Sequence, residues 1–161
     1  MTTSSTSTTT AVPRQTGPIE RLRGWLVTHS LSILRVSLGL VFLTFAIPKY
    51  VPGLSPAADL AASTIEVLTL GIIGGQGAVL LTAIVETIIG LTLITGRFVK
   101  VGLVVLAVAL VGIMSPLVLF SDLMYAGGPS LEAQYVFKDI VLAAAALVIA
   151  AQTLGARLRV G

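Results

Sequence analysis

The chain has 161 residues, of which 55% are hydrophobic and only 11% are charged, and its formal net charge is +3. Soluble domains carry about 25% charged residues, so this composition excludes a globular protein surrounded by water and predicts a membrane protein. There is no cysteine, which excludes disulfides and thiolate metal sites. The basic residues lie at the ends of apolar segments, where membrane topology uses them, so we expect no nucleic-acid partner.

Four apolar segments follow an N-terminal region that begins rich in Ser and Thr. Because this region lacks apolar periodicity, we expect residues 1–24 to form a disordered cytoplasmic tail. The apolar segments are 25–47, 77–95, 101–120 and 135–154. Each is long enough to cross a bilayer as a helix, which bonds every backbone polar group internally. The sequence therefore predicts an all-α fold, a four-transmembrane-helix bundle over residues 25–157, and a second cytoplasmic tail at 158–161.

Basic residues indicate how the spans are oriented. If four spans alternate, seven basic residues lie on one side of the membrane: Arg14, Arg21, Arg23, Arg97, Lys100, Arg157 and Arg159. Lys49 and Lys138 lie at the other side, together with most of the acidic residues. The positive-inside rule then predicts a multi-pass protein with both termini in the cytoplasm.

The two loops on the outer side are long enough to hold structure. In the first, Ser55 and Pro56 are typical of a helix start, with Ser as the N-cap and Pro at the first helical position. We expect a short extra helix over residues 56–70, ended by Gly71. In the second, over residues 121–132, a Gly-Gly-Pro sequence predicts a turn.

Small residues on two spans predict where the helices approach each other. Gly39 lies on the face of the first span that also carries Arg35 and Lys49. Ala83 and Gly90 lie on one face of the second span. Because small residues let helices pack closely in lipid, we expect these two faces to meet.

Glu86 lies within the second span on the same face as Ala83 and Gly90. A carboxylate at the bilayer centre costs roughly 2.5–3.5 kcal/mol on insertion scales, so Glu86 requires a partner or a function. Counted from the predicted cytoplasmic helix ends, Arg35 lies about 15 Å deep and Glu86 about 14 Å deep. This predicts a buried Arg35–Glu86 pair. Three roles stay open: an architectural pair that fixes register, an unpaired Arg35 that reaches toward the membrane surface, and a functional pair.

Lys49, Lys138 and Asp139 are candidate ligand-binding residues near the outer side. Lys49 ends the first span, where the helix macrodipole favours a cation. Lys138 is predicted near the start of the fourth span, where a cation is unfavourable, so it requires a carboxylate, a phosphate or a ligand. Adjacent Asp139 points about 100° away and is a poor partner. The alternative for both lysines is simple anchoring at the membrane surface.

Motifs for self-contained catalysis are missing from the sequence. One histidine, His29, cannot form a metal site without neighbouring ligands, and no Glu-x-x-His spacing exists. There is also no nucleotide-binding glycine loop and no Ser–His–Asp candidate set. Catalytic residues therefore remain unknown, and we expect an accessory subunit with no intrinsic cofactor rather than a complete enzyme.

Three segments resemble DoxX-type membrane proteins. They are Leu34–Tyr50, Ala83–Gly102 and Tyr135–Ala151, and the matching residues are Arg35, Gly39, Phe42, Lys49, Glu86, Gly90, Gly96, Lys138 and Asp139. The resemblance implies a four-helix bundle in the inner (plasma) membrane and a link to redox biology. Relatives in that family include a subunit of a thiosulfate:quinone oxidoreductase and membrane partners of detoxifying enzymes.

The resemblance implies a membrane subunit that supports a redox or stress-detoxification process, with a quinone as the cofactor it would meet. Lys49 and Lys138 would then line an outward-facing pocket. Two other functions stay open: a non-catalytic scaffold that recruits a partner enzyme, and a small transporter or proton pathway built on Glu86. Expected partners are the lipid bilayer and a redox enzyme, another membrane subunit or a second copy of the chain.

Overall fold

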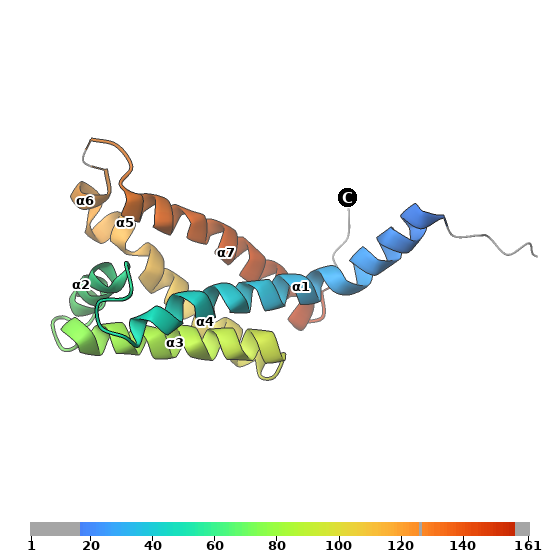
Figure 1. Cartoon of the computed structure of the whole chain (residues 1–161), viewed down its shortest axis with the longest axis horizontal. Helices are drawn as coiled ribbons and strands as arrows, with labels where there is room; N and C mark the ends of the chain where they lie inside the picture. The colour runs from blue at the N-terminus through green and yellow to red at the C-terminus, as the bar shows by residue number, and fades with distance from the viewer. Residues whose placement is uncertain (1–16, 126, 157–161) are drawn as a thin grey trace, which may run out of the picture. The chain divides into compact units, whose positions relative to one another are not determined.

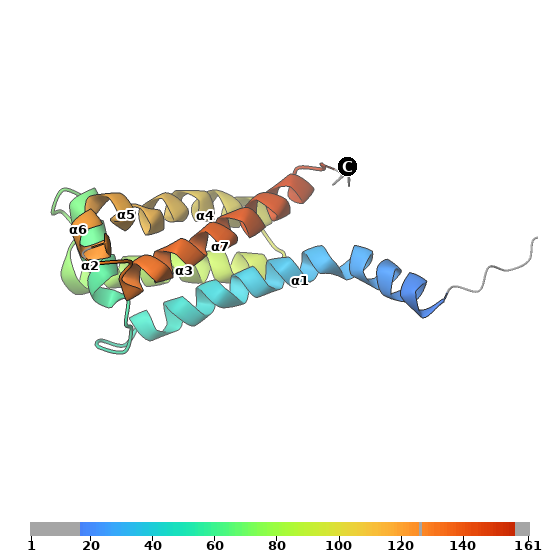
Figure 2. The same cartoon turned by 90° about the horizontal axis from the view of Figure 1, so that it is seen from above.

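The computed structural model describes residues 17–125 and 127–156, and these contain helices and no strand. Of these, residues 17–30 belong to one compact unit and residues 31–125 and 127–156 to another, and helix α1 (Pro18–Lys49) runs from the first into the second. The second unit also contains α2 (Ala58–Leu68), α3 (Gly75–Thr95), α4 (Val99–Met114), α5 (Pro116–Leu119), α6 (Ser121–Tyr125) and α7 (Leu131–Thr153). Figures 1 and 2 show α2, α5 and α6 together at one end of this unit.

Four helices are long and apolar enough to cross a membrane: Pro18–Lys49, Gly75–Thr95, Val99–Leu119 and Leu131–Thr153. The predicted all-α fold with four spans and an extra helix in the first long loop is therefore confirmed. Large apolar side chains cover the outside of the bundle; on α4, Val104, Val108 and Val111 are each at least 65% exposed. Such a surface is suited to lipid, and the fold is that of a multi-pass membrane protein.

All four long helices contribute to the core of the second unit. The fully packed cluster comprises Leu38 and Phe42 from α1, Ile89 and Leu93 from α3, Leu106 from α4, and Ala146 and Ile149 from α7. The side chains of Ile89, Leu93 and Leu106 are completely buried. Dense packing of this kind fixes the rotation of each helix and therefore determines which polar residues face inward.

Two helices, α1 and α7, begin at least four residues earlier than their apolar segments suggested. Helix α1 begins at Pro18 rather than Trp25, because Pro is preorganised for the first helical position and Glu20 is favourable in the first turn. Residues 18–24 are thus helical rather than part of a disordered tail. The rest of the predicted tail, residues 1–16, and residues 157–161 lie outside the described part of the chain.

Helix α7 begins at Leu131 because the Ser130 hydroxyl accepts a hydrogen bond from the Ala133 amide at 3.1 Å. Lys138 therefore lies about 10 Å along the helix rather than at its N-terminal end. The macrodipole acts mainly within the first turn, so the predicted unfavourable interaction with Lys138 does not apply.

The connecting segments differ from the sequence prediction in two places. The first extra helix begins at Ala58 rather than Pro56, because Ser55 forms a preceding turn through its carbonyl, which accepts from the Ala58 amide at 3.2 Å. The helix ends at Leu68, two residues earlier than predicted, and Gly71 follows it in the left-handed conformation and donates to the Glu66 carbonyl at 2.7 Å. Helix α6 in the second loop was not predicted, since five residues carry too little periodicity to detect.

Candidate functional site

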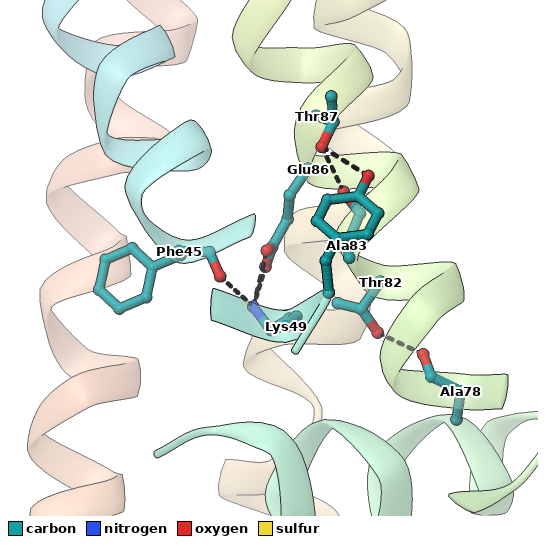
Figure 3. Close-up of polar contacts among 8 residues, drawn as sticks. Phe45, Lys49, Ala78, Thr82, Ala83, Glu86 and Thr87 are labelled. Carbon is teal, nitrogen blue, oxygen red and sulfur yellow. Dashed lines mark hydrogen bonds and ion pairs between the residues drawn. The ribbon is translucent and has the colours of Figure 1, made fainter. Parts of the chain in front are cut away.

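Glu86 forms a buried ion pair with Lys49, and not with Arg35. The Lys49 ammonium lies 2.6 Å from Oε2 and 2.8 Å from Oε1 of Glu86, and it also donates to the Phe45 carbonyl at 3.2 Å. Figure 3 shows the two charged side chains pointing toward each other from α1 and α3. Lys49 is only 3% exposed and Glu86 only 6%. All three ammonium protons thus have acceptors, which a charge removed from water requires.

The close approach of α1 and α3 explains how this pair forms. A Cβ added to Gly39 would lie 2.8 Å from the Gly90 carbonyl oxygen, so the two antiparallel helices touch at these glycines. Lys49 lies about 15 Å beyond this contact along α1, and Glu86 lies about 6 Å beyond it along α3. The two residues are therefore not level along the helix axes. The Lys49 side chain spans the difference because it extends toward the N-terminus of α1, and its hydrogen bond to the Phe45 carbonyl, one turn earlier, fixes that direction.

A neutral hydrogen bond supports the same helix contact. The Tyr50 hydroxyl and the Thr87 hydroxyl lie 2.9 Å apart, and Thr87 in turn donates to the Ala83 carbonyl at 2.7 Å. Tyr50 and Thr87 follow Lys49 and Glu86 directly in sequence. The C-terminal end of α1 is therefore joined to the middle of α3 by two adjacent polar contacts.

Arg35 does not serve as the partner of Glu86, and this corrects the sequence prediction. Its guanidinium donates instead to the carbonyl of Leu93 in the last turn of α3. Carbonyls in the last turn of a helix lack partners within it, and the macrodipole favours a cation there. Gly96 ends α3 in the left-handed conformation, and a Cβ at this position would lie 2.7 Å from Arg35 Nη1. Arg35 therefore caps α3.

The error came from measuring depth at the helix ends. The depth of Arg35 was counted from Trp25, the predicted cytoplasmic end of the first span. Helix α1 begins seven residues earlier, at Pro18, so this reference point was wrong by about 10 Å. Measured from the Gly39–Gly90 contact, Arg35 is level with Ile94, about 12 Å from Glu86 along the helix axis. The sequence did contain a signal for the correct partner. Lys49 lies on the same face of α1 as Arg35, and helical side chains tilt toward the N-terminus of their helix, which for Lys49 is toward the middle of the bundle.

Lys138 and Asp139 of α7 complete a cluster of four charges, which we call the charge cluster: Lys49, Glu86, Lys138 and Asp139. Asp139 is buried, at 9% exposure, and lies close enough to the other three groups for electrostatic interaction. Lys138 is in turn close enough to interact with Asp139 and Lys49. The cluster contains two cations and two carboxylates, so it is electrically neutral when all four groups are ionised.

The Lys138 side chain lies against aromatic rings. Its ammonium is 4.0 Å from the ring centroid of Phe45 on α1 and 4.3 Å from that of Tyr135 on α7. Both distances are within the range of cation–π attraction. In contrast to Lys49, Lys138 is exposed on the surface of the described structure.

A groove of about 430 Å³ lies between α1 and α7 at this point; we call it the Lys138 groove. It is lined by Val41, Phe45, Lys138, Val141 and Leu142. Lys138 is thus the one charged group in a lining that is otherwise hydrophobic. Val141 is 69% exposed, so the groove opens on the surface that lipid would cover.

The predicted packing residues lie where the sequence placed them. Ala83 is fully buried, and Gly39 and Gly90 are buried against each other's helices. A Cβ on Gly90 would lie 2.6 Å from Leu43 Cγ, so this position has no room for a larger residue. The small-residue contact between the first two spans is therefore confirmed.

Comparisons of the chain with protein-family models, with curated proteins and with solved structures find no match. Within residues 17–125 and 127–156, no three potential metal ligands lie together. The charge cluster and the Lys138 groove together form the candidate functional site.

Proposed function

We propose that the chain is an integral membrane subunit of the DoxX type that supports a redox or stress-detoxification reaction by binding a quinone from the lipid phase. One observation carries this proposal: family-matching residues from three separate segments meet in one place. Lys49 from α1, Glu86 from α3, and Lys138 with Asp139 from α7 form the charge cluster. If the three short segments resembled the family only by chance, their matching residues would have no reason to lie close together in the fold.

The Lys138 groove has the chemistry that a quinone requires. Val41, Val141 and Leu142 offer apolar contact to a ring and an isoprenoid chain, and the Phe45 ring offers stacking. The Lys138 ammonium supplies a charge-assisted hydrogen-bond donor for a quinone carbonyl. A bound quinone would supply the two-electron, two-proton redox chemistry that the chain itself lacks.

The neutrality of the charge cluster favours an uncharged ligand. Glu86 is occupied by Lys49, and Asp139 offsets the charge of Lys138. An anion in the groove would have to compete with Asp139, whereas a carbonyl oxygen accepts a hydrogen bond without adding charge. In this proposal Lys138 positions the ligand, while the Lys49–Glu86 pair holds α1 against α3 and so maintains one wall of the groove.

The proposed location is the inner (plasma) membrane with both termini in the cytoplasm. The support is the distribution of basic residues: Arg97 and Lys100 lie in or beside the short turn between α3 and α4. Lys49 and Lys138 lie toward the opposite ends of their helices and are engaged in the charge cluster. This asymmetry agrees with the positive-inside rule.

The experiment measures binding of decylubiquinone to the purified full chain in phosphatidylcholine nanodiscs. Lys138→Met keeps the length of the side chain and removes the donor, so we expect at least tenfold weaker binding, as for loss of a hydrogen bond from a charged group. Lys100→Met, a matched change outside the groove, is expected to bind normally. Unchanged binding by Lys138→Met would rule out the groove. A stoichiometric partner protein with no quinone binding would support the scaffold alternative instead.

A proton pathway is a second candidate, favoured by one observation. Asp139 of α7 lies close enough to Glu86 of α3 to interact with it. Two neighbouring carboxylates on different helices are typical of intramembrane proton relays. Proton flux into liposomes should then fall in both Glu86→Gln and Asp139→Asn; flux equal to that of empty liposomes in the unmodified protein would exclude this function.

A further inference from the structure

A second groove lies at the opposite end of the bundle, beside the turn that joins α3 to α4. Its volume is about 580 Å³, and its lining includes Arg35, Gly96, Phe98, Lys100 and Thr153. We call it the Arg35 groove. It contains none of the residues of the charge cluster, and it therefore requires a separate explanation.

Two cations from different helices line this groove, Arg35 and Lys100, and within residues 17–125 and 127–156 neither has a carboxylate partner. All seven Asp and Glu side chains of the chain lie within the described residues, and none of them forms an ion pair there with Arg35 or Lys100. Arg35 uses one donor for the Leu93 carbonyl, and within residues 17–125 and 127–156 no other acceptor engages its guanidinium. Four of its five N–H groups thus remain for a ligand.

Lys100 strengthens the preference for an anion. It lies in the first turn of α4, where the macrodipole disfavours an uncompensated cation. Arg35, by contrast, is held in place by its hydrogen bond to the end of α3. An anion between the two side chains would offset both charges, and Arg35 is already oriented to receive it.

The position of the groove matches that of a lipid headgroup. The turn from Gly96 to Phe98 connects two membrane-spanning helices, so it lies at the surface of the bilayer. Phe98 is 77% exposed and Val101 is 54% exposed, so hydrophobic side chains lie beside the two cations. A soluble anion gains nothing from these side chains, whereas the acyl chains of a lipid cover them.

We propose that the Arg35 groove binds the phosphate of an anionic membrane lipid, with Arg35 and Lys100 as its ligands. The apolar rim selects a lipid over free phosphate. The site stands apart from the quinone proposal, because it involves other residues at the other end of the bundle.

Native mass spectrometry of the full chain tests this site. The protein is released from mixed micelles that contain phosphatidylglycerol and phosphatidylcholine with identical acyl chains in equal amounts. We expect retained phosphatidylglycerol to exceed phosphatidylcholine, and R35Q and K100Q each to lower that preference about fivefold. R97Q removes the same charge from an exposed residue of the same turn that does not line the groove, and it should keep the preference.

Three results would overturn the proposal. An equal loss in R97Q would indicate nonspecific attraction by the general surface potential, because Arg97 does not line the groove. Stabilisation of the protein by inorganic phosphate in phosphatidylcholine alone, equal to that by phosphatidylglycerol, would indicate a site for soluble anions. A preference unchanged in K100Q would remove Lys100 from the site; this variant leaves the cap of α3 intact, so it remains informative if R35Q does not fold.

Discussion

Replacing Glu86 with Gln should destabilise the protein strongly. The change leaves the Lys49 ammonium, which is 3% exposed, with the Phe45 carbonyl and a neutral amide as its acceptors. Opposite charges about 4 Å apart interact by about 4 kcal/mol at the effective dielectric constant of a partly buried site. Breaking a buried pair by removing one partner costs about 3–5 kcal/mol, because the other charge is left uncompensated. We therefore expect a loss of about 3–5 kcal/mol in the free energy of unfolding.

The assay is reversible unfolding in mixed detergent micelles, followed by helical circular dichroism. Lys49→Met should cost a similar amount, and the double variant should cost no more than either single variant, which gives a coupling energy of at least about 3 kcal/mol. Arg35→Gln is the control: it should add to Glu86→Gln with little coupling, because Arg35 contacts Leu93 instead. A Glu86→Gln protein within 1 kcal/mol of the parent, or coupling to Arg35 rather than Lys49, would refute this account.

Two further predictions concern glycines and use the same unfolding assay. Gly39→Ala should cost about 1–3 kcal/mol, because its Cβ would lie 2.8 Å from the Gly90 carbonyl oxygen, a backbone atom that cannot move aside alone; a neutral effect would show that α1 and α3 do not touch there. Gly96→Ala should cost about 1–2 kcal/mol, since φ is +71° and the Cβ would press on Arg35. Gly77→Ala, with nothing within 4 Å, should cause no loss, and equal loss in both variants would contradict the assignment of strain to Gly96.

The fold could be predicted because lipid imposes few solutions on a chain of this composition. Long apolar segments must be helices, and the small residues Gly39 and Gly90 identify which faces meet. Helix ends were less certain, since Pro18 and Ser130 extend helices into polar sequence that hydropathy assigns to loops. Such errors of one or two turns do not change the fold, but they change which charged residues are level with each other.

The candidate site was predicted as a set of residues but not as a set of contacts. Glu86, Lys49, Lys138 and Asp139 were each identified from the sequence, yet Glu86 was assigned to Arg35. Arginine is the better bidentate partner for a carboxylate, which favoured that choice. The structure shows that reach and register outweigh this preference: Arg35 is needed where α3 ends, whereas Lys49 can extend along its own helix to Glu86.

The two cations of α1 illustrate how pairing determines what each end of the bundle can bind. Arg35 and Lys49 are fourteen residues apart, a separation of about 21 Å along the helix, so they lie toward opposite sides of a hydrocarbon layer about 30 Å thick. Lys49 is neutralised by Glu86, and its neighbourhood is balanced further by Lys138 and Asp139. Among the described residues Arg35 has a carbonyl as its one partner, and it lines a groove together with Lys100. The balanced end therefore suits an uncharged ligand and the unbalanced end suits an anion. Because the two ends differ in this way, Lys138→Met should spare lipid binding and Lys100→Gln should spare quinone binding; one variant abolishing both would show that the two grooves are not independent sites.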